Sequence, residues 1–350
     1  MRLDRTQWKI QALTALFVLS TGACSVNRPS EQWENDVLEA QTQLDRGTLK
    51  DLKPLEDAVQ SAPDEPRKRW AIRQLAERLL EEKDNEAAEK YLLALTEPPI
   101  IDPHGAWAMY QRSLLQKSKG NDRESLSRLF ATILKYPNEI PAEWALEDLK
   151  KRYLASESFE GWDAVLKRMY PWIQASMLAE NLLFERGRNY DVNLRDPDRA
   201  MKVYAQIWAD HPEEALADDA IWEIAQIQAR VQNWNAAIHN FMILTESGES
   251  SWFVGTYNSQ WLDDAILEVA HAWVHLGEHE KASQWFLRFV DEYSDSLRAP
   301  YALWLGAECY RLMGADEHHL SLMKRLTREY PDSKWARRAS ARLGPGGGDD

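Results

Sequence analysis

The sequence lacks most of the features that mark an enzyme or a nucleic-acid-binding protein. It has only two cysteines, which cannot form a disulfide framework. Asp and Glu outnumber Lys and Arg by 56 to 42, and the net charge of −14 repels phosphate backbones. No phosphate-binding glycine loop, nucleophile elbow or HExxH motif occurs. We therefore expect no enzymatic activity, no cofactor and no nucleic-acid partner.

Long apolar runs are also missing, and the one short run lies at the N-terminus. Three basic residues precede an apolar stretch at 12–19, and small residues follow at 21–23. The stretch is too short to cross a bilayer as a permanent helix. Residues 1–23 are therefore expected to be an export signal peptide. They carry a net charge of +2, so their removal would leave −16.

The residues around the first cysteine, Ser-Thr-Gly-Ala-Cys at 20–24, resemble the bacterial lipobox. This resemblance implies that Cys24 is lipidated and becomes the mature N-terminus. Ser25 after the cysteine implies the outer membrane. Thr21 stands where the motif usually has leucine, so ordinary cleavage to a soluble periplasmic protein is the alternative. Residues 24–65 would then form a tether and two helices, at 31–46 and 49–60, which either cap the following array or stand off from it.

From residue 66 the sequence repeats itself. The Trp-Ala pairs at 70–71, 107–108 and 144–145 are each 37 residues apart. An alanine holds the same place in eight units: Ala71, Ala108, Ala145, Ala179, Ala220, Ala265, Ala302 and Ala339. A small residue at one fixed place indicates that two helices cross there closely. A period of this length is typical of stacked helical hairpins.

Turn signals divide these units. Tyr-Pro or His-Pro pairs at 136–137, 170–171, 211–212 and 330–331 should end the preceding helix. Polar turns then split each unit into two antiparallel helices. The pattern predicts seven hairpins, starting near residues 66, 105, 141, 175, 215, 262 and 299. A lone polar helix at 333–343 would cap the stack, and residues 344–350 would be a disordered tail.

The sixth unit carries the clearest family resemblance. Ala270, Gly277, Ala282 and Phe286 match the small and large residues of a tetratricopeptide repeat (TPR). The resemblance covers residues 66–343 and implies an all-α, right-handed α-solenoid of about seven TPR-like hairpins. With the lipobox-like start, the chain resembles TPR lipoproteins of the bacterial envelope, such as that of the outer-membrane β-barrel assembly machine and the Tol–Pal-associated TPR protein.

This resemblance implies a non-catalytic periplasmic scaffold that binds other proteins in an envelope assembly or secretion complex. First helices line the concave face of such arrays. Exposed positions on them are the candidate partner-binding residues: Arg73, Gln74, Gln111, Asp148, Glu223 and Glu268. The acidic surface favours a neutral or basic protein partner. Only the lipid anchor would contact the membrane.

An insertion at 247–260 separates the fifth and sixth units. It contains Trp252, Phe253 and Tyr257, which would be costly to expose in a free loop. The insertion therefore either folds back onto the stack or contacts a partner.

Two further patterns have competing interpretations. Glu268, His271 and His275 share a helix face, with His279 beyond the turn, and this spacing could hold zinc. The alternative, which we expect, is that these are surface and turn residues that bind no metal. A chain rich in Trp could also handle peptidoglycan or exported polysaccharide. Trp70, Trp107 and Trp144 adjoin the packing alanine, however, and this position predicts that they pack between helices.

Overall fold

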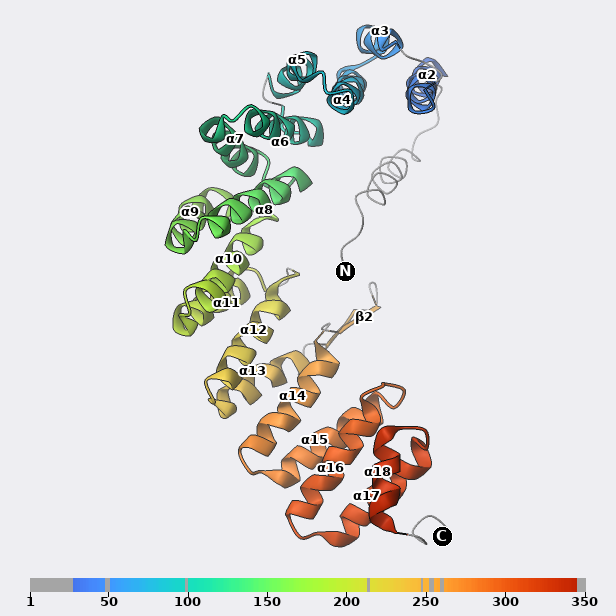
Figure 1. Ribbon diagram of the computed structural model, residues 1–350, viewed down its shortest axis with the longest axis vertical. Helices are drawn as coiled ribbons and strands as arrows, with labels where there is room; N and C mark the ends of the chain where they lie inside the picture. Colours follow the sequence, from blue (N-terminus) through green and yellow to red (C-terminus); the bar gives the residue numbers. More distant parts are fainter. Residues whose placement is uncertain are drawn as a thin grey trace. The chain divides into compact units, whose positions relative to one another are not determined.

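The computed structural model describes residues 28–47, 51–97, 100–212, 215–246, 248–251, 255–258 and 261–344. Within these ranges the chain is a succession of α-helices joined by short turns (Figure 1). It divides into two compact units, residues 1–141 and 142–350. Each unit is described by itself.

Unit 1 contains an N-terminal helix pair and two hairpins. Its helices are α2 (Arg28–Asp45), α3 (Lys53–Ser61), α4 (Glu65–Glu81), α5 (Asn85–Thr96), α6 (Pro103–Ser118) and α7 (Asp122–Lys135). Val37 of α2 and Leu55 of α3 are buried in one cluster with Leu75 and Leu79 of α4. The N-terminal pair therefore packs on the first hairpin.

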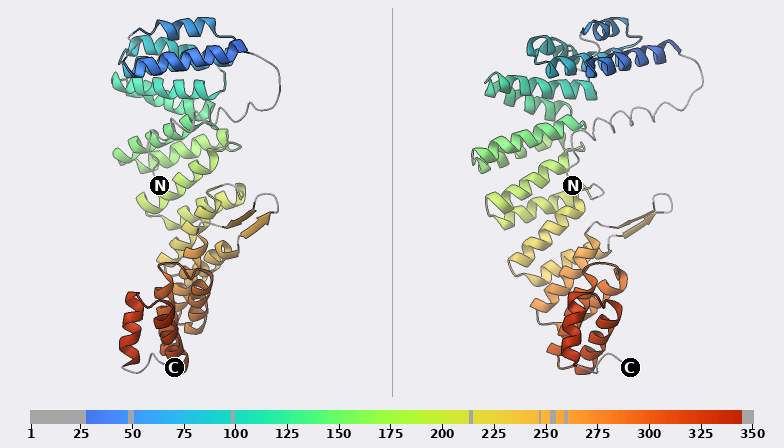
Figure 2. Two further views of the ribbon diagram at one scale, coloured as in Figure 1. Left: turned by 90° about the vertical axis from the view of Figure 1, so that its right-hand side faces the viewer. Right: turned by 45° about the vertical axis from the view of Figure 1, so that its right-hand side comes forward.

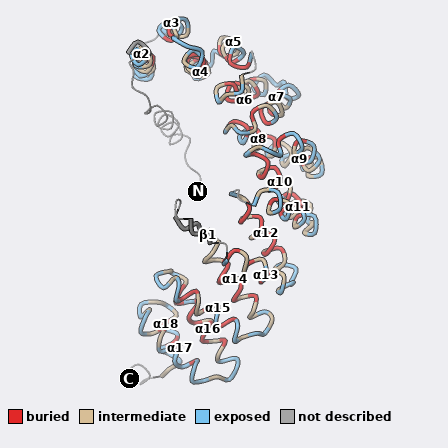
Figure 3. Tube along the Cα trace, turned by 180° about the vertical axis from the view of Figure 1, so that it is seen from behind, coloured by how far each residue is buried: buried red, intermediate tan, exposed pale blue. Residues whose placement is uncertain are grey.

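Unit 2 contains five hairpins and a final helix. The helices are α8 (Ile140–Ala155), α9 (Phe159–Ile173), α10 (Ala179–Arg188), α11 (Pro197–Asp210), α12 (Ala217–Arg230), α13 (Trp234–Glu246), α14 (Leu262–His275), α15 (His279–Glu292), α16 (Ala299–Leu312), α17 (Asp316–Glu329) and α18 (Lys334–Leu343). A π-helical turn, η1 (Asn189–Asn193), extends α10. Buried positions lie where successive helices face each other (Figure 3).

The seven hairpins expected from the repeat are all present in the described residues, so the all-α, TPR-like solenoid is confirmed. The eight packing alanines are buried, with at most 2% of their surface exposed. A longer side chain at these places would meet the neighbouring helix. On α18, Ala336 and Ala339 face the stack while Lys334, Arg337 and Arg338 are exposed.

Every hairpin turn places one residue in the left-handed region, two positions before the second helix begins. The seven residues have φ between 52° and 77°: Lys83, Gly120, Glu157, Arg195, Gln232, Gly277 and Gly314. Glycine suits this conformation because it has no Cβ. The three glycines agree with the turn signals, whereas the other four turns accept the strain of a side chain there.

Two local expectations were wrong or incomplete. Pro171 does not end its helix, because α9 continues to the buried Ile173. The missing N–H falls in the last turn, where losing one hydrogen bond is tolerated while Ile173 gains burial. The π turn after α10 was not expected; Asn189 anchors it by donating to the carbonyl of Phe159 at 2.8 Å.

The insertion forms an antiparallel hairpin rather than an irregular loop. Strand β1 (Gly248–Ser251) pairs with β2 (Gly255–Asn258), and Tyr257 lies opposite Glu249. Figures 1 and 2 show the two strands extending away from α13 and α14. Trp252 and Phe253 lie outside the described residues, and nothing is described of the Tyr257 side chain. Both interpretations of the insertion therefore remain predictions.

Candidate functional site

Two pockets open between first helices of consecutive hairpins in unit 2. The α8–α10 pocket has a volume of about 350 Å³ and the α12–α14 pocket about 440 Å³. Ligand pockets commonly measure roughly 300–1,000 Å³. Each is therefore large enough to receive a side chain of a bound segment.

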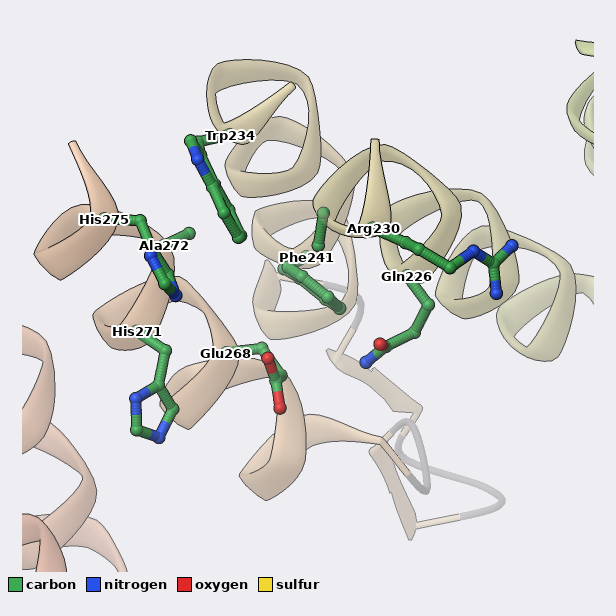
Figure 4. A pocket seen from close by; sticks show the side chains of 9 residues that line it. Gln226, Arg230, Trp234, Phe241, Glu268, His271, Ala272 and His275 are labelled. Carbon is green, nitrogen blue, oxygen red and sulfur yellow. The ribbon is translucent and has the colours of Figure 1, made fainter. Parts of the chain in front are cut away.

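The α12–α14 pocket has two helical walls and an aromatic floor (Figure 4). Residues that line it are Gln226, Ala229 and Arg230 on α12, Trp234 and Phe241 on α13, and Glu268, His271, Ala272 and His275 on α14. The rings of His275 and Trp234 stack with centroids 4.0 Å apart and planes 4° apart. This stack fixes the upper edge of the pocket.

Glu268 has no charged partner in this pocket. Its carboxylate makes no hydrogen bond and no ion pair in the described part of the chain. Burial raises the pKa of Glu268; Asp264 adds to this rise and Arg298 opposes it. Arg298 is itself paired with Asp263 and Asp264. A half-buried carboxylate without a partner is energetically costly.

The nearby basic groups do not compensate this carboxylate. Burial lowers the pKa of His271, and His275 lowers it further, so His271 is neutral at pH 7. Its ring meets Phe286 edge-on, with centroids 5.3 Å apart. Arg230 pairs with Asp191, and its side chain extends away from Glu268 in Figure 4.

Glu223 holds the equivalent position one hairpin earlier, three residues after its packing alanine. Burial raises the pKa of this carboxyl also, with Asp191 adding to the rise and Arg188 opposing it. Glu223 likewise makes no hydrogen bond or ion pair within the described ranges. Consecutive first helices therefore present unpaired, half-buried carboxylates on the same face.

The α8–α10 pocket differs because a lysine of the chain pairs with two of its three acids, whereas the third, Glu143, makes no hydrogen bond or ion pair in the described residues. Nζ of Lys150 lies 2.5 Å from Oε2 of Glu147 and 3.0 Å from Oε1 of Glu185. These contacts raise the pKa of Lys150 although burial opposes them. Trp144 and Phe184 form part of the lining. This pocket holds its own cation.

The tryptophans beside the packing alanine do not all pack as expected. Trp107 is buried, and Trp70 meets Trp33 edge-on at 5.9 Å. Trp144, however, is 41% exposed, so the packing prediction is wrong for this residue. The reason is local: Trp144 faces the opening between α8 and α10, where no helix covers it.

The other predicted partner-binding residues on first helices differ in burial and in the groups they contact. The guanidinium of Arg73 lies 5.0 Å from the centroid of the Trp107 ring, and burial lowers the pKa of Arg73. Gln74 accepts a hydrogen bond from Gln41 of α2, so it serves packing within the unit. Gln111 is half-buried on α6. In unit 2, Asp148 lies 4.0 Å from Nζ of Lys151.

No group of three His, Cys, Asp or Glu side chains in the described ranges could hold a metal ion. The set of Glu268, His271, His275 and His279 is therefore not gathered into a ligand cluster. None of the described helices is long and apolar enough to span a membrane. Residues 1–23 and Cys24 lie outside the described residues, so the signal peptide and lipidation stay predictions.

Sequence reasoning missed the aromatic floor and the internal lysine. Trp234 and Gln226 were not candidates, although Gln226 lies three residues after Glu223 and so shares its helix face. The pairing of Lys150 with Glu185 joins residues 35 positions apart. Repeat register could have found this pair, because it joins equivalent turns of consecutive first helices.

No protein-family model matches the sequence, and no curated protein matches it. Solved structures are similar in fold. One is the C-terminal part of a TPR repeat-containing protein from Cytophaga hutchinsonii, 12% identical, covering 76% of this chain and 98% of that one with a TM-score of 0.44. The type IV pilus biogenesis factor PilW is 14% identical, with coverages of 77% and 97% and a TM-score of 0.35. The apo quorum sensor NprR from B. thuringiensis is 15% identical, with coverages of 91% and 98% and a TM-score of 0.38. At such low similarity, the fold assignment rests on the hairpins of this chain.

Proposed function

We propose that this protein is a non-catalytic scaffold that binds a segment of a partner protein along the first helices of unit 2. The observation that supports this most directly is the pair of open pockets between first helices, together with the unpaired carboxylates of Glu223 and Glu268. Unpaired half-buried charge is costly in the free protein. A bound cation would relieve that cost.

The charge of the chain favours a neutral or basic partner. A net charge of −14 attracts basic surfaces and speeds their approach at low ionic strength. The same charge disfavours nucleic acid. The partner is therefore proposed to be a protein segment with exposed Lys or Arg.

We place this scaffold at the periplasmic face of the outer membrane, held by a lipid on Cys24, as part of an envelope assembly or secretion complex. The support is the signal-like start and the lipobox-like residues at 20–24. A soluble periplasmic form is the alternative. Globomycin treatment, which blocks lipoprotein processing, should leave an uncleaved precursor; normal processing in its presence would favour the soluble form.

Site-specific photo-crosslinking in intact cells tests the scaffold. A photoreactive residue at Trp144 or Gln226 should capture an envelope protein, because both positions line pockets. The control position is Lys202, which is exposed on the second helix α11. Equal capture from Lys202 would contradict a binding face on the first helices.

One observation favours a second candidate, the handling of peptidoglycan or exported polysaccharide. The exposed indole of Trp144 in the α8–α10 pocket offers an apolar surface with a polar N–H, which suits a sugar ring. Retention of the purified protein on peptidoglycan, lost on Trp144→Ala and accompanied by no captured protein, would favour this candidate over the scaffold.

A further inference from the structure

We infer that the α12–α14 pocket is a binding site for a single Lys or Arg side chain of the partner segment, with Glu268 as its counter-ion. The inference rests on the proposed function and gives it a chemical specificity. Three features of unit 2 carry it: the isolated carboxylate, the occupied neighbouring pocket, and the aromatic floor.

The first feature is the environment of Glu268. Its carboxylate lines an open cavity and has no hydrogen-bond or ion-pair partner in the described chain. Among the described residues, the nearby cations are already paired: Arg230 with Asp191, and Arg298 with Asp263 and Asp264. A charge-assisted hydrogen bond from a ligand is roughly twice as strong as a neutral one.

The second feature is the α8–α10 pocket, which shows what such an acidic opening accepts. There, Lys150 of the chain itself lies between Glu147 and Glu185. Lys150 stands five residues after the packing alanine of α8, and the equivalent residue of α12 is the buried Ala225. The methyl group of Ala225 cannot reach across the α12–α14 pocket. The α12–α14 pocket therefore lacks a cation paired with its glutamate, since Arg230 in its lining pairs with Asp191 instead.

The third feature is the pocket lining. Trp234 provides an apolar surface for the methylene stem of a lysine or arginine, while the charged end reaches Glu268; Phe241 also lines the pocket, but its side chain is fully buried. Neutral His271 does not repel a cation, and the amide oxygen of Gln226 can accept a hydrogen bond. An acidic ligand side chain would instead meet an uncompensated carboxylate.

Peptide titration of the full-length protein tests this assignment. The probes are N-acetyl-Gly-Gly-Lys-Gly-Gly-amide, its arginine counterpart, and a norleucine version that keeps the stem but removes the charge. Binding is followed by the indole ¹H–¹⁵N signal of Trp234, identified with Trp234→Phe. We expect the lysine and arginine peptides to shift this signal at concentrations at least tenfold lower than the norleucine peptide requires.

Two variants and one control test whether Glu268 is the counter-ion. Glu268→Gln should weaken lysine-peptide binding about tenfold or more, as expected when a hydrogen bond to a charged group is lost. Glu280→Gln is the matched control, because Glu280 is exposed on α15 and has no partner in the described residues. Gln226→Lys should block the pocket by placing an ammonium group beside Glu268.

Equal affinity for the lysine and norleucine peptides, or equal binding by Glu268→Gln and Glu280→Gln, would overturn the inference. Its failure is distinguishable from that of the scaffold. A partner captured equally from Trp144 in the wild type and in Glu268→Gln would overturn the pocket assignment and leave the scaffold intact. Capture of no protein from either pocket would overturn the scaffold, and the inferred partner with it.

Discussion

The two pockets of unit 2 have similar positions and differ in how their carboxylates are paired. Between α8 and α10, Lys150 forms ion pairs with both Glu147 and Glu185, although Glu143 of the same lining has no partner in the described residues. Between α12 and α14, Glu268 has no such partner, and burial raises its pKa. Similar backbones thus give one pocket in which an internal ammonium group pairs with two carboxylates and one in which Glu268 has no such group. The difference indicates where a ligand gains most by binding.

The largest effect should follow from disturbing the packing of α10, one wall helix of the α8–α10 pocket, against α11. A Cβ added at Gly187 of α10 would lie 2.6 Å from the buried ring of Tyr204. Overpacking of this kind costs about 1–3 kcal/mol, and we expect Gly187→Ala to lie at the upper end of that range. Gly306→Ala is the control, since its nearest contacts would be 3.5 Å away. Urea unfolding checks both; equal stability of the two variants would contradict the close contact.

Removing the internal cation should make the two pockets alike. Lys150→Ala leaves Glu185 without an ammonium partner and Glu147 with only the exposed Lys151, which should cost about 1.5–3 kcal/mol of unfolding free energy. It should also allow the lysine peptide to bind in the α8–α10 pocket. The control is Lys151→Ala, because Lys151 is 66% exposed and lies 3.7 Å from Glu147. No difference in stability between the variants would show that Lys150 contributes nothing to that pocket.

Removing the aromatic edge of the α12–α14 pocket should have a smaller effect. His275→Ala deletes the ring that stacks on Trp234, and such ring pairs contribute about 0.5–1.5 kcal/mol. We expect a lower melting temperature and weaker binding of the lysine peptide. His239→Ala, at an exposed position of α13, is the comparison. An unchanged melting temperature in His275→Ala would mean that the stack is not formed in solution.

The smallest effect should be a gain in stability. The pKa of Glu268 is higher in the folded protein than in the unfolded chain, so the folded state binds more protons between those two values. Stability therefore falls as pH rises through that window, and at pH 7 the carboxylate carries its full cost. Glu268→Gln should be slightly more stable than the wild type at pH 7 and equal to it near pH 4. A lower melting temperature at pH 7 would show that Glu268 supports the fold.

Peptide binding should follow the same ionisation. As pH falls through the raised pKa of Glu268, the carboxylate gains a proton and loses its attraction for a cation. The titratable and charged groups around it are Asp264, His271 and His275 on its own helix, Arg298 at the start of α16, and Arg230 of α12. Lysine-peptide affinity should fall below that pKa in the wild type and stay flat in Glu268→Gln. A flat profile in both proteins would exclude Glu268 as the counter-ion.

The sequence predicted the hairpins well because its strongest signals are local. The packing alanines indicate where two helices approach closely, and the turn glycines indicate where the backbone is left-handed. Both features depend on few neighbouring residues. Glu223 and Glu268 were placed on the first-helix face by spacing alone. The repeat register places Lys150 and Glu185 in equivalent turns of consecutive first helices, but it could not show which carboxylates have no cation partner. Nor could it show that Trp144 faces an opening while Trp107 is covered.

The most direct test is to place a photoreactive phenylalanine at Gln226 and to identify the partner residue that it joins in intact cells. We predict a segment of an envelope protein in which Lys or Arg lies at or beside the joined residue, and loss of this product in Glu268→Gln. A joined segment that is acidic, or a product unchanged in Glu268→Gln, would contradict the central claim that this pocket selects a basic partner.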